Sequence, residues 1–348
     1  MLKVKGKKIN TPFFMPDATR AVIKQLSTAE AKKIGLEAMV VNTFHLYLQP
    51  GLEIIKKAGG VHQFMNWPGL LLSDSGGFQI YSLIHKGQGM GKITDDGAYF
   101  KSPLDGSKHF LSPEKSIQIQ FDLGVDMMVC LDDCPPNESD KEGLEKAVKR
   151  TIMWAKRSKV EYNKQLKKRK IKDKDRPLLF AVIQGGLNLK LRAKCAQELV
   201  ALNFDGYGFG ARHIDSDGNF LNKVLTHTVG LIPKDKFRFA LGIGTPEDIK
   251  KCVKMGWDMF DCVIPTREGR HGRLFVKAGK GYKTININNT KFKKDFSAIN
   301  KNSHLSELTG YSKAYLYHLF KINEPLGQKL ASLNNLEVYL DLMASLRK

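Results

Sequence analysis

The chain has 348 residues, which fits one large α/β barrel or a two-domain protein, and 42% of them are hydrophobic, enough for a sizeable core. With 56 Lys and Arg against 35 Asp and Glu, the net charge of +21 indicates a polyanionic partner, nucleic acid ahead of an anionic membrane, unless the whole surface is simply Lys-rich. No window approaches the roughly 18 apolar residues of a membrane span, and the first residues lack the apolar core of a signal peptide, so we expect a cytoplasmic protein without membrane contact.

Short apolar runs alternate with helical patterns along the first three quarters of the chain. Seven of them read as strands: 38–42, 69–74, 126–132, 178–186, 204–210, 237–244 and 258–265. Most are apolar on both faces, as strands of a covered parallel sheet are. Helix signals lie between them: 27–35 begins with capping-box spacing, and 245–256 has Thr before Pro at its start and Gly at its end.

The ends of these runs decide between two architectures. Strand and helix alternation of this length predicts either a (β/α)8 barrel or a doubly wound sheet. Nearly every run ends in a polar residue or glycine: Asn42, Asp74, Asp132, Gln184, Gly210, Gly244 and Asp261. A barrel brings such ends to one face and one site, whereas an open sheet spreads them along a crevice. We therefore predict an α/β fold, a (β/α)8 TIM barrel.

Two segments depart from the alternation. Residues 156–177 carry a dense positive charge, which predicts an exposed helix followed by a loop, either a solvated surface or a contact with a nucleic-acid backbone. Beyond about residue 276 a short β-like piece precedes helical stretches at 311–322 and 334–348. We predict a catalytic barrel over 1–276, with the basic insertion near 156–177, and a C-terminal β/helical appendage over 277–348.

The acids at the strand ends indicate chemistry on a glycosidic bond. Asp74, followed by two glycines, and Asp261 lie at corresponding ends of different runs, although a single strand-end Asp is more often a cap. Two converging carboxylates are the usual means of cleaving such a bond, one attacking the anomeric carbon and the other handling the proton. Asp132 and Gln184 with nearby glycine backbone supply donors and acceptors that suit a purine edge.

Neighbouring residues extend this candidate site. Phe78 and Leu241 are placed to sandwich a ring, although on spacing alone Phe78 could equally be a core residue. Arg267 and Arg270 follow Asp261 closely and suit phosphate or base-edge recognition; a random basic loop is the alternative.

With these features the sequence resembles the tRNA-guanine transglycosylase (queuine tRNA-ribosyltransferase) family. The motifs are NTFHLYLQPG (42–51), SDSGGFQ (73–79), LDDCPP (131–136), QGG (184–186), LGIGTPED (241–248), DMFDCVIPTR (258–267) and YSKAYLYHL (311–319). They stand in family order and cover almost the whole chain. The resemblance implies a barrel enzyme of tRNA queuosine modification that exchanges the wobble guanine of tRNA with a GUN-type anticodon for a 7-deazaguanine, and a possible homodimer.

The resemblance also implies roles for residues. Asp261 would attack the ribose C1′ and hold the tRNA covalently, and Asp74 would be the general acid/base for the incoming base. The purine would be bound by Asp132, Gln184, Gly210 and Ala211, with Phe78 and Leu241 stacking on it, although the family more often has Met at the latter position. Arg267 and Arg270 would read the anticodon loop.

One departure concerns zinc. Family members usually carry a CxCxxC motif before the YS-AYL helix and a His in the last helix. The corresponding positions here are Ser303, Leu305, Leu308 and Asn334. We therefore predict no cofactor and no structural metal, with apolar packing in place of the ion.

A second departure lies beside the purine. The family usually has GGLSVGE where this chain has GARHIDS (210–216), so that Ala211 and Arg212 alter a loop expected to meet the substituent of the base. The resemblance implies preQ1 as the base, because Cys134 follows the Asp pair as in bacterial-type enzymes. A queuine-specific salvage enzyme, or one that takes another 7-deazaguanine, is the alternative. A catalytically idle tRNA-binding subunit and an enzyme acting on DNA are further alternatives; the retained Asp261 opposes the former and the 311–319 motif the latter.

Overall fold

The computed structural model describes residues 1–86, 90–279 and 281–347, so positions 87–89, 280 and 348 of the two predicted regions lie outside the described residues. Its centre is one parallel sheet of eight strands in the order β3-β13-β12-β11-β10-β9-β5-β4. The strands are β3 (Phe13–Pro16), β4 (Ala38–Asn42), β5 (Leu70–Asp74), β9 (Met127–Val129), β10 (Leu178–Ile183), β11 (Gly206–Phe209), β12 (Phe237–Ala240) and β13 (Met259–Cys262).

The sheet closes on itself between its first and last strands. Asp17, directly after β3, forms a parallel bridge with Val40 of β4, and the Ala18 N–H donates to the Val40 carbonyl at 2.7 Å. The predicted barrel is therefore confirmed. Seven of its strands match the runs read from the sequence; the eighth, β3, was missed.

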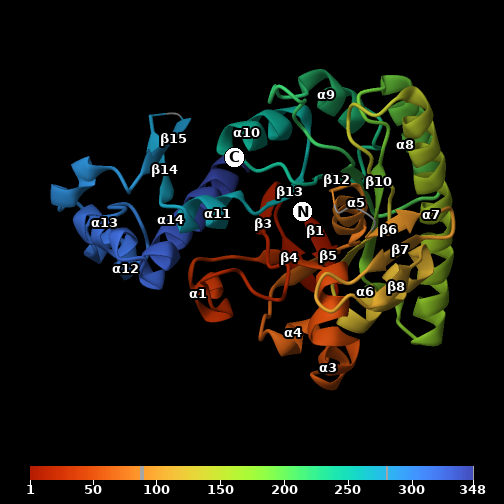
Figure 1. Cartoon of the computed structure of the whole chain (residues 1–348), viewed down its shortest axis with the longest axis horizontal. Helices are drawn as coiled ribbons and strands as arrows, with labels where there is room; N and C mark the ends of the chain where they lie inside the picture. The colour runs from red at the N-terminus through yellow and green to blue at the C-terminus, as the bar shows by residue number, and fades with distance from the viewer. Residues whose placement is uncertain (87–89, 280, 348) are drawn as a thin grey trace.

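Helices surround the barrel and follow the signals in the sequence (Figure 1). Those between successive strands are α1 (Thr28–Lys33), α2 (Thr43–Leu46), η1 (Tyr47–Gly51), α3 (Leu52–Lys57), α4 (Val61–Phe64), α5 (Gly77–Lys86), α6 (Pro113–Leu123), α7 (Lys141–Lys168), η2 (Asp173–Asp175), α8 (Leu189–Ala201), α9 (Asn222–Gly230) and α10 (Pro246–Met255). Ser27 and Glu30 form both bonds of the predicted capping box, and Thr245 caps α10. No helix in the described part of the chain is long and apolar enough to cross a membrane.

The barrel interior is filled by alternate residues of the strands, because successive side chains of a strand point to opposite faces. The inward residues form one apolar cluster: Phe13, Met15, Ala38, Val40, Leu70, Leu72, Met127, Val129, Leu178, Phe180, Val182, Phe239 and Met259. The N-terminal hairpin of β1 (Leu2–Val4) and β2 (Lys7–Ile9) adds Leu2, Val4 and Ile9 to this cluster. The interior is thus a packed core rather than a pore.

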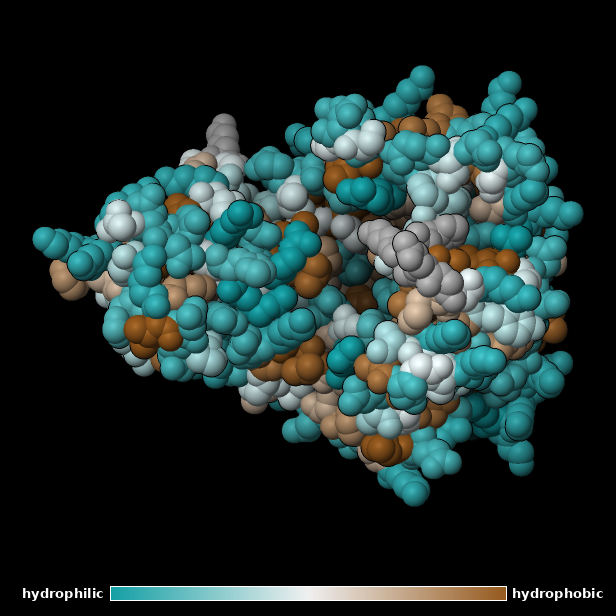
Figure 2. Space-filling view, in the orientation of Figure 1, coloured by the Kyte–Doolittle hydropathy of each residue, from teal (hydrophilic) through white to brown (hydrophobic). Residues whose placement is uncertain are grey.

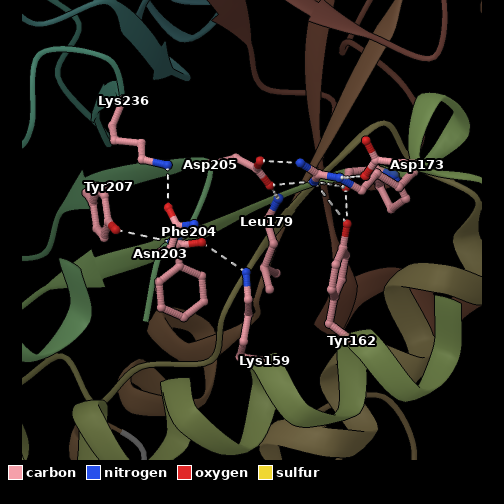
Figure 3. A network of polar contacts seen from close by, with 11 residues as sticks. Lys159, Tyr162, Asp173, Leu179, Asn203, Phe204, Asp205, Tyr207 and Lys236 are labelled. Carbon is pink, nitrogen blue, oxygen red and sulfur yellow. Dashed lines mark hydrogen bonds and ion pairs between the residues drawn. The ribbon is translucent and has the colours of Figure 1, made fainter. Parts of the chain in front are cut away.

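A polar network fixes the amino ends of β10 and β11 (Figure 3). The carboxylate of Asp205 accepts hydrogen bonds from two guanidinium nitrogens of Arg176, at 2.7 and 2.8 Å, and from the Leu179 N–H at 2.8 Å. Lys159 of α7 donates to the Asn203 carbonyl at 3.1 Å. These contacts join α7 to the end of the barrel opposite the polar strand ends.

The basic segment 156–177 is a helix end followed by a loop, as predicted, and most of its basic side chains are exposed, but one face of the helix is buried. Its first part is the end of α7, where Ser158, Glu161, Tyr162 and Gln165 are buried. Tyr162 donates a hydrogen bond to the Pro177 carbonyl, just before β10. The segment therefore leads to the amino ends of the strands, which favours the solvated-surface interpretation over contact with a nucleotide at the carboxyl ends.

Two further small sheets were not predicted as such. The strands β6 (Gly91–Ile93), β7 (Ala98–Lys101) and β8 (Lys108–Leu111) form an antiparallel sheet between α5 and α6. The hairpin of β14 (Arg273–Ala278) and β15 (Gly281–Asn286) follows α11 (Ile264–Arg270), so the predicted boundary after residue 276 falls inside β14.

The C-terminal elements gather on one side of the barrel, opposite α7 and α8 (Figure 1). They are η3 (Thr290–Lys294), α12 (Ser306–Gly310), α13 (Lys313–Lys321) and α14 (Pro325–Leu346). Within α14, Tyr339 donates to the Gly244 carbonyl and its ring lies 4.9 Å from that of Phe14 in β3. Arg347 donates to the Pro12 carbonyl at 2.8 Å. The last helix therefore packs on the outside of the barrel at β3.

Candidate active site

A polar layer lies one inward step above the apolar interior. In six strands the residue two positions beyond the last residue of the interior cluster is Asp17, Asn42, Asp74, Gln184, Leu241 or Asp261. On β11, Gly210 takes the corresponding place, two positions beyond Gly208. Since the alternation continues, these residues face the axis of the barrel at its carboxyl end. The structure thus brings together the strand-end residues read from the sequence and adds Asp17.

Asp74 ends β5 and lies beside Asn42, its register partner on β4. The Asn42 side-chain amide donates to Oδ2 of Asp74 at 2.8 Å. Burial raises the pKa of Asp74 to about 6; hydrogen bonds from the backbone of Ser75 and Gly76 oppose this, and the charge of Asp17 adds to it. A carboxyl group with such a pKa can give and take a proton near neutral pH.

Asp261 lies on β13 opposite Met15 of β3. Its Oδ1 accepts a hydrogen bond from the Gly242 N–H at 2.9 Å, which orients the carboxylate. Burial raises the pKa of Asp261 to about 7, and the charges of Asp74 and Asp17 raise it further against the Gly242 bond. The carboxylates of Asp17, Asp74 and Asp261 therefore interact electrostatically with one another.

Asp132 and Gln184 form a pair of hydrogen-bonding groups. The Gln184 amide donates to Oδ2 of Asp132 at 2.7 Å. Burial raises the pKa of Asp132 to about 7, with the charges of Asp74 and Asp133 adding to it and the Gln184 bond opposing it. Asp133 faces away, since its Oδ2 pairs with Arg150 of α7 at 2.5 Å.

Two glycines leave room for the neighbouring side chains. A Cβ atom at Gly210 would lie 2.4 Å from the Gln184 amide nitrogen, and one at Gly208 would lie 2.3 Å from Cδ1 of Leu241. Contacts this short are excluded by van der Waals repulsion. Glycine at both positions therefore permits the observed orientations of Gln184 and Leu241.

Phe78 lies near the start of α5, just after Asp74 and the two glycines. It is 51% exposed, so the core interpretation is wrong, whereas its stacking on a base stays a prediction. The surface is hollowed near the middle of the view in Figure 2, close to where Figure 1 places α5. A ring that enters beside Asp74 would pass Phe78.

The loop 210–216 is held in place by hydrogen bonds to the side chain of Asn137. Its side chain donates to the carbonyls of Arg212 and Ile214, at 2.9 and 3.2 Å, and accepts from the Arg212 N–H at 3.2 Å. Asn137 is 3% exposed. Ala211 has φ +153°, a backbone conformation that glycine adopts more easily than alanine. The Arg212 side chain is exposed.

Arg267 and Arg270 lie on α11, which begins directly after β13. Arg267 is about half exposed, and its Nε lies 3.5 Å from Oε1 of Glu268. Nη1 of Arg270 is buried and has no hydrogen-bond partner among the described residues. Such a donor is costly to leave unpaired, so it is suited to an acceptor from a ligand or from water.

Comparisons with known proteins show the family of the chain. A family model described as Queuine tRNA-ribosyltransferase matches residues 1–348. The chain belongs to this family. It is 41% identical over 340 residues to the queuine tRNA-ribosyltransferase of Caldanaerobacter subterraneus, covering 98% of this chain and 86% of that relative. The corresponding protein of Halothermothrix orenii is 39% identical over 346 residues, 99% of this chain and 88% of the relative, and that of Aliivibrio fischeri strain MJ11 is 41% identical over 340 residues, with coverages of 98% and 86%.

The positions where the family resemblance implies zinc do not fit a metal ion. Leu305 and Leu308 are buried at 3% and 0% exposure, and the Asn334 amide donates to the Phe275 carbonyl at 3.0 Å. Ser303 accepts a hydrogen bond from the Leu305 N–H at 2.9 Å. Among the described residues, no three His, Cys, Asp or Glu side chains are grouped so that they could hold a metal ion. Apolar and amide groups are poor zinc ligands.

Sequence reasoning missed two inward-facing residues and one supporting residue. Asp17 was overlooked because β3 was, although the run FFMPD has the same pattern of apolar residues ending in an acid. Asn42 was noted as a strand end but given no part in the site. Asn137 carries no sequence signal, since its contacts reach 75 residues along the chain.

The raised pKa of Asp261 predicts a pH-dependent effect of its removal. An unfolded Asp titrates near about 3.9, whereas the folded carboxyl titrates at about 7. Between these pH values the folded state binds the extra proton, so the free energy of unfolding falls as pH rises. We expect Asp261→Asn, which cannot ionise, to be more stable than the native protein at about pH 8, on the order of 1–3 kcal/mol, with the difference vanishing near about pH 4.

Urea unfolding at the two pH values measures this difference. Asp235→Asn is the control, because Asp235 is exposed just before β12 and its side chain has no ion pair among the described residues. This variant should stay close to the native stability at both pH values. An equal stability difference for Asp261→Asn at both pH values would contradict the electrostatic account of this carboxyl.

Proposed function

We propose that the chain exchanges the wobble guanine of tRNA for a 7-deazaguanine through a covalent intermediate on Asp261. Membership of the family makes it a tRNA-guanine transglycosylase, a pentosyltransferase. The observation that carries the proposed mechanism is the pair Asp74 and Asp261 in one inward-facing layer, each with a pKa raised by burial. Two carboxyl groups with distinct partners are the equipment of a double displacement.

The first displacement forms a bond between the Asp261 carboxylate and C1′ of the ribose. The bond from C1′ to N9 of guanine breaks, its electron pair leaves with guanine, and protonated Asp74 supplies the proton that neutralises the leaving base. In the second displacement, Asp74 takes the proton from N9 of the incoming base. That nitrogen attacks C1′ and Asp261 leaves, so the configuration at C1′ is retained.

Recognition of the base follows from the groups beside the two acids. Asp132 accepts from the N–H groups of a guanine-like edge, and Gln184, already bonded to Asp132, offers its carbonyl and amide. Gly210 and Ala211 add backbone groups, and Phe78 and Leu241 would cover the two faces of the ring.

PreQ1 is the base that we propose for this site. Cys134 follows the Asp pair, as in bacterial-type relatives, and Asn137 forms three hydrogen bonds with the loop 210–216, which contains the altered residues. A loop held by three hydrogen bonds limits the space for the substituent on the 7-deaza ring. The small substituent of preQ1 fits such a space better than the larger substituent of queuine. A queuine-specific enzyme would exchange tRNA guanine for queuine but not for preQ1.

The tRNA contact is proposed at α11. The exposed Arg267 and the buried donor of Arg270 stand just beyond Asp261, where the nucleotides that flank the reacting one would lie. We propose tRNA with a GUN-type anticodon as substrate and a homodimer as the assembly. A catalytically idle subunit is disfavoured, because Asp74 and Asp261 are both present and each accepts a hydrogen bond, from Asn42 and from Gly242.

Exchange of radiolabelled guanine into bulk tRNA tests the proposed function. The native protein should incorporate label. Asp261→Ala should lose incorporation completely, because it removes the nucleophile, and Asp74→Asn should slow it by about 10²–10⁴-fold, because it removes the acid/base.

Asp258→Asn is the matched control, since Asp258 precedes the same strand at its opposite end and bonds the Arg238 N–H there. It should exchange guanine at close to the native rate. Binding of tRNA without any incorporation of label by the native protein would support the idle-subunit alternative instead.

We propose that residues 277–348 hold together without zinc. Leu305 and Leu308 pack in the core, and the His304 N–H donates to Oε1 of the buried Glu337 at 2.8 Å, which ties the 303–308 segment to α14. Apolar burial of two leucines contributes about 3–6 kcal/mol, enough to retain a small segment.

Metal analysis of the purified protein tests this. We expect far less than one zinc per chain, and a chelator should leave the midpoint of thermal unfolding unchanged, because Ser303, Leu305, Leu308 and Asn334 offer no thiolate or imidazole ligand. Stoichiometric zinc together with a lower midpoint in chelator would show that a metal site exists elsewhere in the chain.

A further inference from the structure

Asp17 stands at the closure of the barrel, between the strand of Asp261 and the strand of Asn42. Met15 is the register partner of Asp261, so Asp17 lies one inward step nearer the mouth than Asp261 on the adjacent strand. Its own partner across the closure is Val40, which belongs to the interior cluster. Paired residues of neighbouring strands point to the same face, so the Asp17 side chain faces the axis.

The strand order separates Asp17 from the groups that would bind the base. On one side of β13 the neighbouring strands are β12, β11 and β10, which end at Leu241, Gly210 and Gln184 respectively. The next strand is β9, and Asp132 follows it. In the other direction the first strand is β3, with Asp17. When Asp261 approaches C1′ of the bound nucleotide, a base that extends towards the first group leaves the rest of the ribose on the side of Asp17.

The Asp17 carboxylate is held locally and keeps one oxygen available. Oδ1 accepts hydrogen bonds from the Thr19 N–H at 2.8 Å and from the Thr19 hydroxyl. Oδ2 receives no hydrogen bond from the described residues. An oriented carboxylate with a vacant acceptor is suited to a hydroxyl donor.

The charges of Asp74, Asp261 and Arg270 interact with that of Asp17, as expected if Asp17 faces the site. The negative charge of Asp17 raises the pKa of both Asp74 and Asp261 in addition to burial. Burial lowers the pKa of Arg270, and the charge of Asp17 opposes this, so the guanidinium lies within reach of the carboxylate. A positive group beside Asp17 offsets its repulsion of the phosphates that flank the ribose.

We propose that Asp17 is a specificity-determining residue that accepts a hydrogen bond from the 2′-hydroxyl of the nucleotide whose base is exchanged. This inference rests on the proposed function and deepens it. Inside an RNA strand the 2′-hydroxyl is the free hydroxyl of the ribose, and it distinguishes RNA from DNA. A carboxylate that bonds it at the reacting sugar favours RNA, and the bond strengthens as positive charge develops at C1′.

The test compares two stem-loops that differ by one oxygen atom. Both are RNA with a GUN-type anticodon; one has guanosine and the other 2′-deoxyguanosine at the exchange position. The measured quantity is kcat/KM for incorporation of labelled guanine, in the native protein, Asp17→Ala and Asp17→Asn. The intrinsic effect of the hydroxyl on the glycosidic bond is present with every enzyme, so it cancels when the ribo-to-deoxy ratios are compared.

We expect the ribo-to-deoxy ratio of the native protein to exceed that of Asp17→Ala by about tenfold or more, as for a hydrogen bond to a charged group. Asp17→Asn, which keeps an acceptor without the charge, should fall between the two and serves if the alanine variant does not fold. Asp258→Asn should keep the native ratio. An unchanged ratio in both Asp17 variants, with exchange still measurable, would overturn the inference alone. Absence of exchange in the native protein with the ribo substrate would overturn the proposed function as well.

Discussion

The site depends on the period-two alternation of a closed barrel, which faces every second strand residue towards one axis. Below the mouth this alternation buries apolar side chains such as Met15 and Val40. One step above, it places carboxylates and amides from distant parts of the chain side by side. The closure at Asp17 and Val40 is the contact that completes the ring, and without it Asp261 and Asp74 would lie towards opposite edges of an open sheet.

Burial of acids in this layer links stability to chemistry. Removing Asp74, Asp132 and Asp261 from water disfavours their ionised forms and raises their pKa values towards neutrality. The same burial costs stability, and single hydrogen bonds from Asn42, Gln184 and Gly242 offset part of that cost. Each bond also fixes the carboxylate that it stabilises. In the proposed double displacement, the groups that make burial tolerable would also orient the carboxylates.

The sequence predicted what depends on local pattern, and it failed where distant contacts decide. The barrel is confirmed because its strands are apolar and end in polar residues, and the family is confirmed by motifs that span the chain. Strand β3 was not predicted, because its four residues are too few to show a periodic pattern, and Asp17 was therefore missed as a site residue. The supporting role of Asn137 depends on a loop 75 residues away. Local charge density suggested an exposed basic segment, but burial of the face with Tyr162 comes from tertiary packing. The roles assigned to Asp74, Asp261 and the base-binding residues stay predictions.

The central claim is that Asp261 bonds the ribose of the tRNA. Mass spectrometry of the acid-quenched and digested mixture of protein and a tRNA stem-loop, with no free base added, measures this bond directly. We predict a ribose-linked fragment on the peptide that contains Asp261, which disappears when an acceptor base is added before the quench and is absent from Asp261→Asn. Guanine exchange that proceeds without any adduct, or an adduct on a different residue, would contradict the assignment of Asp261 as the nucleophile.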